Sequence, residues 1–175
     1  MKLLAFSGST RKESLNTKLI NETARLAKDL KIDVTVIDLK DYPLPLFDGD
    51  LEIQIKVPEN ITKLRKLITD HDGLIISAPE YNASISGVLK NTIDWLSRDH
   101  KFLKGRKIIL MSSSPSDYGG SRGLKHLTDV LNNVGMVIMD KQFSLPKGFN
   151  AFDKDGQLVD DAHKKTIVGQ LTSIA

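Results

Sequence analysis

The sequence contains no cysteine among its 175 residues. This absence excludes a disulfide framework, thiolate metal sites and a cysteine nucleophile, and it fits a reducing compartment. Long apolar runs are missing as well. No window approaches about 18 consecutive apolar residues, and the first residues show no charged segment followed by a long apolar one. We therefore expect a cytoplasmic protein that is neither exported nor inserted in a membrane.

A strong excess of one charge sign is also lacking. The chain has 25 Lys and Arg against 22 Asp and Glu, a formal net charge of +3 and an isoelectric point near 9.0. Because the basic residues are dispersed among the acidic ones, no stripe suits a nucleic acid, and small anionic ligands are favoured. With 40% hydrophobic residues, the chain can bury a core, and we expect one domain over residues 1–175.

Several motifs of nucleotide-binding and catalytic sites are absent. Gly8 is followed by Ser-Thr-Arg, so there is no G-x-G-x-x-G pattern, and G-x-x-x-x-G-K-[ST] does not occur. These absences argue against a Rossmann dinucleotide site and a nucleoside triphosphatase. Asp38 is interpreted as a surface or capping residue rather than a ribose-binding acid. G-x-S-x-G and H-E-x-x-H are missing too, so we expect no bound metal and four structural histidines.

Short apolar segments alternate with segments of helical apolar spacing. The apolar segments are continuous, which is typical of strands covered on both faces in a parallel sheet. Strands are expected over residues 2–7, 32–39, 72–78, 107–113 and 136–139, and helices over residues 16–30, 61–68, 88–96, 124–134 and 160–173. Residues 40–58 and 140–157 are expected to be long loops, with a small hairpin over residues 150–157.

This alternation predicts a flavodoxin-like α/β fold. It would be a three-layer sandwich with a five-stranded parallel sheet of order 2-1-3-4-5 and helices on both faces. In this order the ligand crevice opens at the carboxyl ends of strands 1 and 3. The unusual segments follow strands 1, 3 and 4: GSTRKESLN (residues 8–16), PEYNASISG (79–87) and SSPSDYGGSRG (113–123). We therefore expect these three loops to meet at one crevice.

The loop after the first strand has the composition of an anion site. A helix N-terminus carries unpaired N–H groups and a partial positive charge, so a polar loop that ends there attracts phosphate. Short donors are Ser9, Ser14, Asn16 and Thr17, and Arg11 adds a cation. The alternative is that Ser14 or Asn16 only caps the helix and that Arg11 is solvated. The missing nucleotide motifs favour a monophosphate as the ligand.

Two of these segments together resemble a known family. GSTRKESLN and PEYNASISGVLKNTIDWLSR (residues 79–98) are similar to segments of the NADPH-dependent FMN reductases. That family has a flavodoxin-like fold and includes quinone, azo-dye and chromate reductases. The resemblance covers residues 1–135. It implies an FMN cofactor, NADPH or NADH as co-substrate, a small-molecule electron acceptor, and a homodimer or homotetramer.

The resemblance also implies where the parts of FMN would lie. The phosphate would be held by Ser9, Arg11, Ser14, Asn16 and Thr17, and the isoalloxazine would be bordered by Pro79, Glu80, Tyr81 and Asn82. The third wall would be Ser114, Pro115, Tyr118, Gly119 and Gly120. The turn after Pro79 would let the backbone amides of residues 80–82 face the polar edge of the ring. Because a carboxylate is repelled by reduced flavin, we expect Glu80 to point away, for instance toward a basic residue of another subunit.

The expected chemistry belongs to the flavin, so no catalytic side chain is predicted. NAD(P)H oxidation and reduction of a quinone, azo compound, free flavin or metal oxyanion would alternate at one site in a ping-pong scheme. Trp95 is interpreted as a core or subunit-contact residue. One alternative is an electron carrier of flavodoxin type, which the isoelectric point near 9.0 disfavours because such carriers are usually acidic. The other is a non-enzymatic flavin-binding partner protein that senses redox state.

Overall fold

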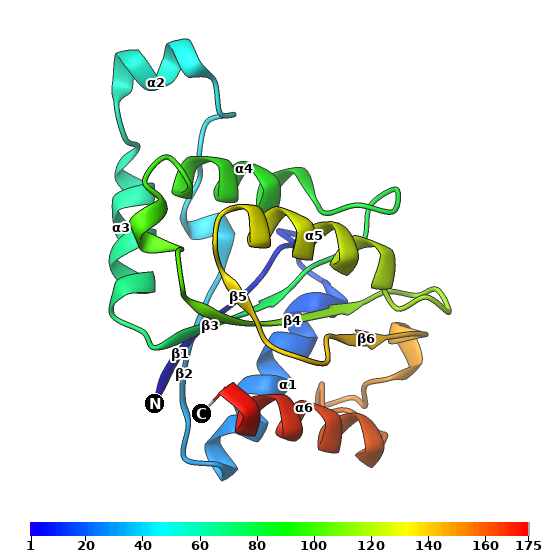
Figure 1. Cartoon of the computed structure of the whole chain (residues 1–175). Coiled ribbons are helices and arrows are strands. Elements are labelled where there is room, and N and C mark those ends of the chain that lie inside the picture. The colour runs from blue at the N-terminus through cyan, green and yellow to red at the C-terminus, as the bar shows by residue number, and fades with distance from the viewer. Residues whose placement is uncertain (175) are drawn as a thin grey trace.

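A single parallel sheet runs through the centre of the molecule (Figure 1). The structure is a computed structural model and describes residues 1–174. The strand order is β2-β1-β3-β4-β5, and β6 pairs with β4 beyond the end of β5. The strands are β1 (Lys2–Ser7), β2 (Asp33–Ile37), β3 (Gly73–Ser77), β4 (Lys107–Ser113), β5 (Val137–Ile138) and β6 (Phe143–Leu145). The predicted flavodoxin-like order is confirmed.

Helices cover both faces of the sheet. On one face lie α1 (Leu15–Asp29) and α6 (Asp161–Ile174), and on the other lie α3 (Glu59–Thr69), α4 (Gly87–Leu96) and α5 (Ser121–Asn133) (Figure 1). The short α2 (Gly49–Ile55), between β2 and α3 in the chain, projects from the body. Three short 3-10 turns are η1 (Leu39–Asp41), η2 (His100–Phe102) and η3 (Gly148–Asn150).

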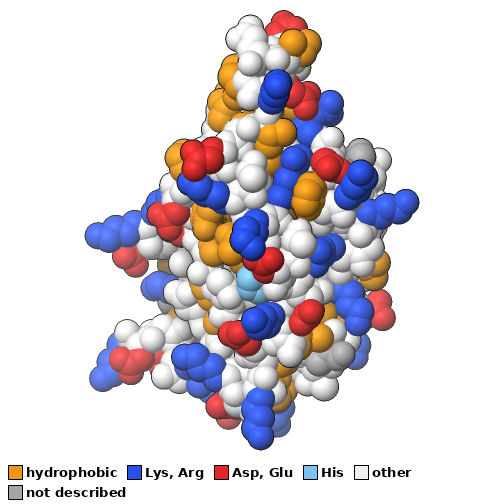
Figure 2. All heavy atoms as spheres, turned by 90° about the vertical axis from the view of Figure 1, so that its left-hand side faces the viewer, with side chains coloured by type: hydrophobic (Ala, Val, Ile, Leu, Met, Phe, Trp, Pro, Cys, Tyr) orange, Lys and Arg blue, Asp and Glu red, His pale blue; other side chains and the backbone are white. Residues whose placement is uncertain are grey.

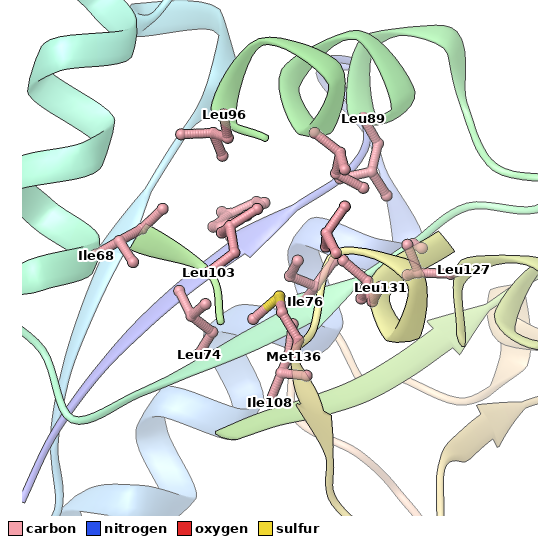
Figure 3. Close-up of a cluster of buried hydrophobic side chains, with 14 of the residues drawn as sticks. Ile68, Leu74, Ile76, Leu89, Leu96, Leu103, Ile108, Leu127, Leu131 and Met136 are labelled. Carbon is pink, nitrogen blue, oxygen red and sulfur yellow. The ribbon is translucent and has the colours of Figure 1, made fainter. Parts of the chain in front are cut away.

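Alternation of side chains along the strands creates two cores. In β1, Leu3 and Ala5 face α1 and α6, whereas Leu4 and Phe6 face the opposite layer. All four are 4% exposed or less, which explains why the strand sequences are continuous apolar runs. Figure 3 shows the second of these cores, with Leu74, Ile76 and Ile108 from the sheet and Leu89, Leu96, Leu127 and Leu131 from α4 and α5.

Two expected loops contain regular structure. The predicted loop over residues 40–58 contains α2, whose seven residues are too few for a periodicity analysis to distinguish from a loop. The predicted loop over residues 140–157 contains β6, which pairs with the carboxyl end of β4. The small hairpin expected over residues 150–157 is present as an antiparallel bridge between Phe152 and Leu158.

Trp95 is a core residue that also anchors a loop. Its side chain is 1% exposed, and its indole Nε1 donates a hydrogen bond to the Pro45 carbonyl at 2.9 Å. The Phe47 ring meets the indole edge-on, with ring centroids 5.0 Å apart. Its interpretation as a core residue is confirmed, and the buried indole is not available as a subunit contact.

Gly119 and Gly120 are required by packing in the turn between β4 and α5. Both have left-handed backbone conformations, with φ of 59° and 86°. A Cβ on Gly119 would lie 2.8 Å from the Pro146 nitrogen, and a Cβ on Gly120 would overlap the Ser112 hydroxyl. The turn therefore lies directly against β4 and the segment that follows β6.

Replacing Gly120 with Ala should lower the free energy of unfolding by about 2–5 kcal/mol, because backbone strain and overpacking add. The matched control is Gly156→Ala, where φ is 79° but nothing lies within 4 Å of the added Cβ. That control should lose only about 1–2 kcal/mol. Urea unfolding of both variants measures the difference, and equal losses would contradict the close approach at Gly120.

Candidate functional site

The loops after β1, β3 and β4 meet at one hollow at the carboxyl edge of the sheet, as predicted. The lining residues are Ser9, Arg11, Ser14, Leu15, Asn16, Pro79, Glu80, Tyr81, Ser113, Ser114 and Pro115. Every one of the three predicted loops contributes. The predicted residues that do not line this hollow are Thr17, Asn82, Tyr118, Gly119 and Gly120.

Two hydroxyl groups of the first loop remain available as donors. Ser9 and Ser14 are buried, with 6% and 4% of their surface exposed. The Ser14 hydroxyl caps α1 by accepting from the backbone N–H groups of Asn16 at 3.2 Å and Thr17 at 3.4 Å, so the capping role is confirmed. The Ser9 hydroxyl accepts from the Arg11 N–H at 3.2 Å. Within residues 1–174 neither hydroxyl donates a hydrogen bond, so each can donate to a ligand.

The same loop offers backbone donors and a cation. The N–H groups of residues 10, 12 and 13 have no acceptor among the described residues. Arg11 is exposed, and its guanidinium Nη2 donates to the Glu13 carbonyl at 2.9 Å. Its remaining N–H groups lie at the N-terminus of α1, where the helix dipole adds positive potential. The loop as a whole is a donor-rich anion site.

Asn16 ties α1 to two strands of the sheet. Its side chain is buried, and Oδ1 accepts from the Ser77 hydroxyl and from the Ser113 backbone N–H, both at 2.9 Å. Its Nδ2 donates to the Ser113 carbonyl at 3.0 Å. The amide is therefore mostly used within the protein, and one of its N–H bonds is left for a ligand.

Thr17 faces a different hollow. It lines a space of about 380 Å³ between α1 and the end of β2, together with Asn21, Asp38 and Tyr42. Each residue turns a helix by about 100°, so the residue after Asn16 points toward β2 rather than β3. The structure does not bring Thr17 to the crevice. Asp38 caps η1 by accepting from the Lys40 N–H at 2.9 Å, as interpreted from the sequence.

The P-E-Y-N segment is a tight hairpin. Tyr81 and Ser84 exchange backbone hydrogen bonds of 2.9 and 3.0 Å around a two-residue turn, with φ of 51° at Asn82 and 61° at Ala83. The prediction that residues 80–82 present consecutive amides needs a correction, because the Tyr81 N–H is used inside the hairpin. The N–H groups of Glu80, Asn82 and Ala83 have no acceptor among the described residues. Asn82 lies at the exposed tip.

Glu80 points to the N-terminus of α5 in the same chain. Its Oε2 accepts from the backbone N–H groups of Arg122 and Gly123, both at 3.0 Å, and its Oε1 accepts from Arg122 Nε at 2.8 Å. The predicted partner in another subunit is therefore wrong. Burial raises the pKa of Glu80, but the hydrogen bonds from Gly123 and Arg122 outweigh burial, and the pKa lies below its ordinary value.

The loop after β4 contributes less than predicted. Ser114 and Pro115 line the hollow. Tyr118 is 61% exposed and lies outside it, with an arginine of α5 stacked 4.7 Å from its ring centroid. Gly119 and Gly120 pack against the residues behind them, so the sheet and not a ring requires these glycines.

Residues that sequence reasoning missed include Ser77, Ser113 and Arg122. The two serines end strands and gave no signal, because their partner Asn16 is identified only in three dimensions. A signal for Arg122 was present: it is the only basic residue in residues 113–123, and Glu80 is the only acidic one in residues 79–87.

Metal and membrane signals are absent from the described part of the chain. Among the side chains that the structure describes, which do not include that of His100, no three His, Asp or Glu gather closely enough to hold an ion. No helix there combines the length and apolar character that crossing a bilayer requires. His126 instead pairs with the Ser84 hydroxyl at 2.9 Å, and His71 contacts the Thr35 hydroxyl at 2.8 Å.

The fold and the hollow together define a class of protein. A doubly wound parallel sheet with unused donors between β1 and α1, next to the switch in strand order, is the arrangement of flavodoxin-like proteins that bind a phosphate-bearing ligand. Residues 1–150 match the NADPH-dependent FMN reductase family. The chain belongs to this family.

Relatives cover nearly the whole chain. It is 33% identical to a probable NADPH:quinone oxidoreductase 2 of Oryza sativa subsp. japonica, over 99% of this chain and 87% of that protein. It is 31% identical to a quinone reductase of Escherichia coli (strain K12), over 99% and 93% of the two chains. A flavoenzyme NAD(P)H:(acceptor) oxidoreductase of Paracoccus denitrificans superposes with a TM-score of 0.85 at 27% identity, over 99% and 96%. An archaeal flavodoxin shares the fold, with a TM-score of 0.64 at 10% identity over 99% of both chains.

The lowered pKa of Glu80 makes part of the stability depend on pH. The carboxylate stabilises the folded chain above its unfolded pKa of 4.5, and this contribution is lost as the pH falls through the lower folded pKa. Glu80→Gln should therefore lower the free energy of unfolding at pH 7 by about 1–3 kcal/mol. In strong acid, the difference in unfolding free energy between this variant and the unmodified chain should shrink.

Urea titrations at neutral and acidic pH measure the difference in unfolding free energy between Glu80→Gln and the unmodified chain. The matched control is Glu52→Gln, which removes a carboxylate paired with Arg98 at 2.8 Å on the projecting α2. The Glu52 side chain is 26% exposed against 7% for Glu80, so its loss should have a smaller effect. A gap for Glu80→Gln that stays constant with pH would contradict the assignment.

Proposed function

We propose that this chain is an FMN-dependent NAD(P)H oxidoreductase that passes two electrons to a small acceptor such as a quinone. The observation that carries the proposal is a set of side-chain donors before α1, from Ser9, Arg11 and Ser14, that line one hollow together with residues 79–81 of the hairpin. Family membership and full-length quinone reductase relatives support the same activity.

The donors of the first loop fit a phosphate monoester. The Ser9 and Ser14 hydroxyls, the Arg11 guanidinium and the free backbone N–H groups all donate, and phosphate oxygens only accept. The two helices that follow the other crevice loops, α4 and α5, are already capped. Ser86 caps α4 by accepting from the Leu89 N–H at 3.3 Å, and Glu80 occupies the start of α5. The phosphate of FMN would therefore be held at α1.

The ring would lie between the hairpin and the loop after β4. Pro79 and Tyr81 would border one side and Ser114 and Pro115 the other, with the free backbone N–H of Glu80 as a donor to its polar edge. FMN supplies the two-electron chemistry when bound. The chain's own residues bind and orient the ring, and Glu80 is engaged with α5 rather than with a substrate.

Four of the residues that the resemblance assigns to FMN binding would, in this proposal, support the loops instead of contacting FMN. Thr17 lines the separate hollow between α1 and β2, Tyr118 lies on the outer surface, and Gly119 and Gly120 let the turn approach β4. Their support is indirect, because each lies outside the hollow's lining.

A pure electron carrier is less well supported. The archaeal flavodoxin has the same fold but little sequence identity, and fold alone does not identify a function. A flavin-binding protein that reports redox state to a partner is the second candidate, and slow turnover with every acceptor would distinguish it. The absence of cysteine supports the cytoplasm as the compartment.

We infer that copies of the chain associate as a homodimer or homotetramer. Figure 2 shows apolar side chains on the projecting part of the molecule, where Leu46 and Ile53 are 81% and 80% exposed. Large apolar side chains that gather on a projecting segment mark a contact surface. Association of copies would cover them.

The absorption spectrum of the purified chain tests the function. It should show the visible bands of oxidised flavin, either as isolated or after addition of FMN. Anaerobic NADPH or NADH should bleach the bands, and a quinone added afterwards should restore them. Colourless protein that takes up no FMN would overturn the proposal, and bleaching without reoxidation by any small acceptor would favour the redox-reporting candidate.

Arg11→Ala should weaken FMN binding about 10- to 100-fold, because a charge-assisted hydrogen bond to phosphate is lost. Riboflavin has no phosphate, so its affinity should stay unchanged, as should turnover at saturating FMN. Lys12→Ala is the matched control, since Lys12 is the neighbouring base and does not line the hollow. Fluorescence titrations give both affinities, and a loss of turnover with normal FMN binding would refute this role of Arg11.

A further inference from the structure

The N-terminus of α5 is capped by a residue from a distant loop. Its own N-cap residue, Gly120, offers no side chain. Glu80 instead accepts from the N–H groups of Arg122 and Gly123, and the Arg122 side chain adds a further hydrogen bond to the same carboxylate. The Glu80 side chain is 7% exposed. This end of the hairpin is therefore fixed relative to α5.

A second contact with α5 fixes the other end of the hairpin. The Ser84 hydroxyl lies 2.9 Å from His126 Nδ1, about one helical turn beyond Arg122. Between these contacts lies Gly123, where a Cβ would be 3.1 Å from the Ser84 carbonyl oxygen and 3.2 Å from Glu80 Cβ. One face of α5 thus contacts both ends of the hairpin.

The turn between these ends does not form by local preference alone. Asn82 and Ala83 both have positive φ, and neither is glycine. A left-handed backbone is tolerated by Asn but is unfavourable for Ala. Such a conformation persists where surrounding contacts over-determine it. The contacts made by Glu80 and Ser84 with α5 meet this requirement.

We propose that Glu80 is a positioning residue for the flavin ring. Held by the start of α5, its carboxylate sets the hairpin so that Pro79, Glu80 and Tyr81 border the ring and the unused Glu80 N–H is available to its polar edge. The inference rests on the proposed function and adds a division of labour to it. Ring binding depends on the contact between the hairpin and α5, whereas phosphate binding depends on the loop before α1.

The division can be tested with two ligands, because riboflavin has the ring of FMN without the phosphate. Glu80→Gln should weaken both riboflavin and FMN binding about tenfold and leave the ratio of the two Kd values unchanged. Fluorescence titration of the flavin-free chain measures both. At saturating riboflavin, the visible spectrum of the bound ligand should also shift toward that of free riboflavin, because donors to the ring have moved.

Matched variants separate positioning from general stability. Glu52→Gln removes another inter-element carboxylate–arginine pair, away from the hollow, and should change neither affinity nor the spectrum. Arg11→Ala should change the FMN affinity alone. If Glu80→Gln does not fold, Arg122→Ala and Ser84→Ala carry the test, since the Arg122 side chain is 54% exposed and Ser84 is half-buried. Each should weaken riboflavin binding by a smaller factor and shift the spectrum in the same direction.

The outcomes distinguish this inference from the proposed function. Folded variants that bind riboflavin with the affinity and spectrum of the unmodified chain would overturn the positioning role and leave the oxidoreductase proposal intact. An unmodified chain that binds neither riboflavin nor FMN would overturn the proposed function and the positioning role with it.

Discussion

The side-chain amide of Asn16 holds together the three elements on which the crevice depends. Its oxygen accepts from Ser77 at the end of β3 and from Ser113 at the end of β4, and its nitrogen donates back to Ser113. The amide is 3% exposed, so a partner lost here would leave a buried polar group unsatisfied. These hydrogen bonds therefore fix the start of α1 relative to the ends of β3 and β4. They thereby also position the donors in the loop before Asn16.

Three helices follow the loops of the crevice, α1, α4 and α5, and their N-termini are used differently. Ser86 caps α4, and Glu80 caps α5 from another loop. Ser14 caps α1, but the loop before it keeps free N–H groups, hydroxyls and a guanidinium. Because an uncompensated helix N-terminus attracts anions, this distribution concentrates anion binding at α1. The Glu80 carboxylate also neutralises the start of α5 beside the hairpin.

Most of the fold follows from local patterns. The strands are buried on both faces, so residues such as Leu3 to Phe6 form a continuous apolar run, and the run over residues 107–113 coincides with β4. The long helices have an apolar stripe with a period of about 3.6 residues. With seven residues, α2 is too short to show such a stripe clearly, and β6 has only three residues, whose pairing depends on the end of β4. These elements have no local periodic signal to predict them.

The sequence by itself determined the strand order, the three loops that meet at the crevice, and the family. It did so because apolar periodicity and short motifs are local properties of the chain. The partners of individual side chains were decided only by the tertiary structure. Asn16 bonds a residue 97 positions away and Glu80 one 42 positions away. Neither pairing gives a periodic pattern in the sequence. Helix geometry places Thr17 at a different hollow from Asn16. Only the tertiary structure therefore separates the residues that line the crevice from those that support it.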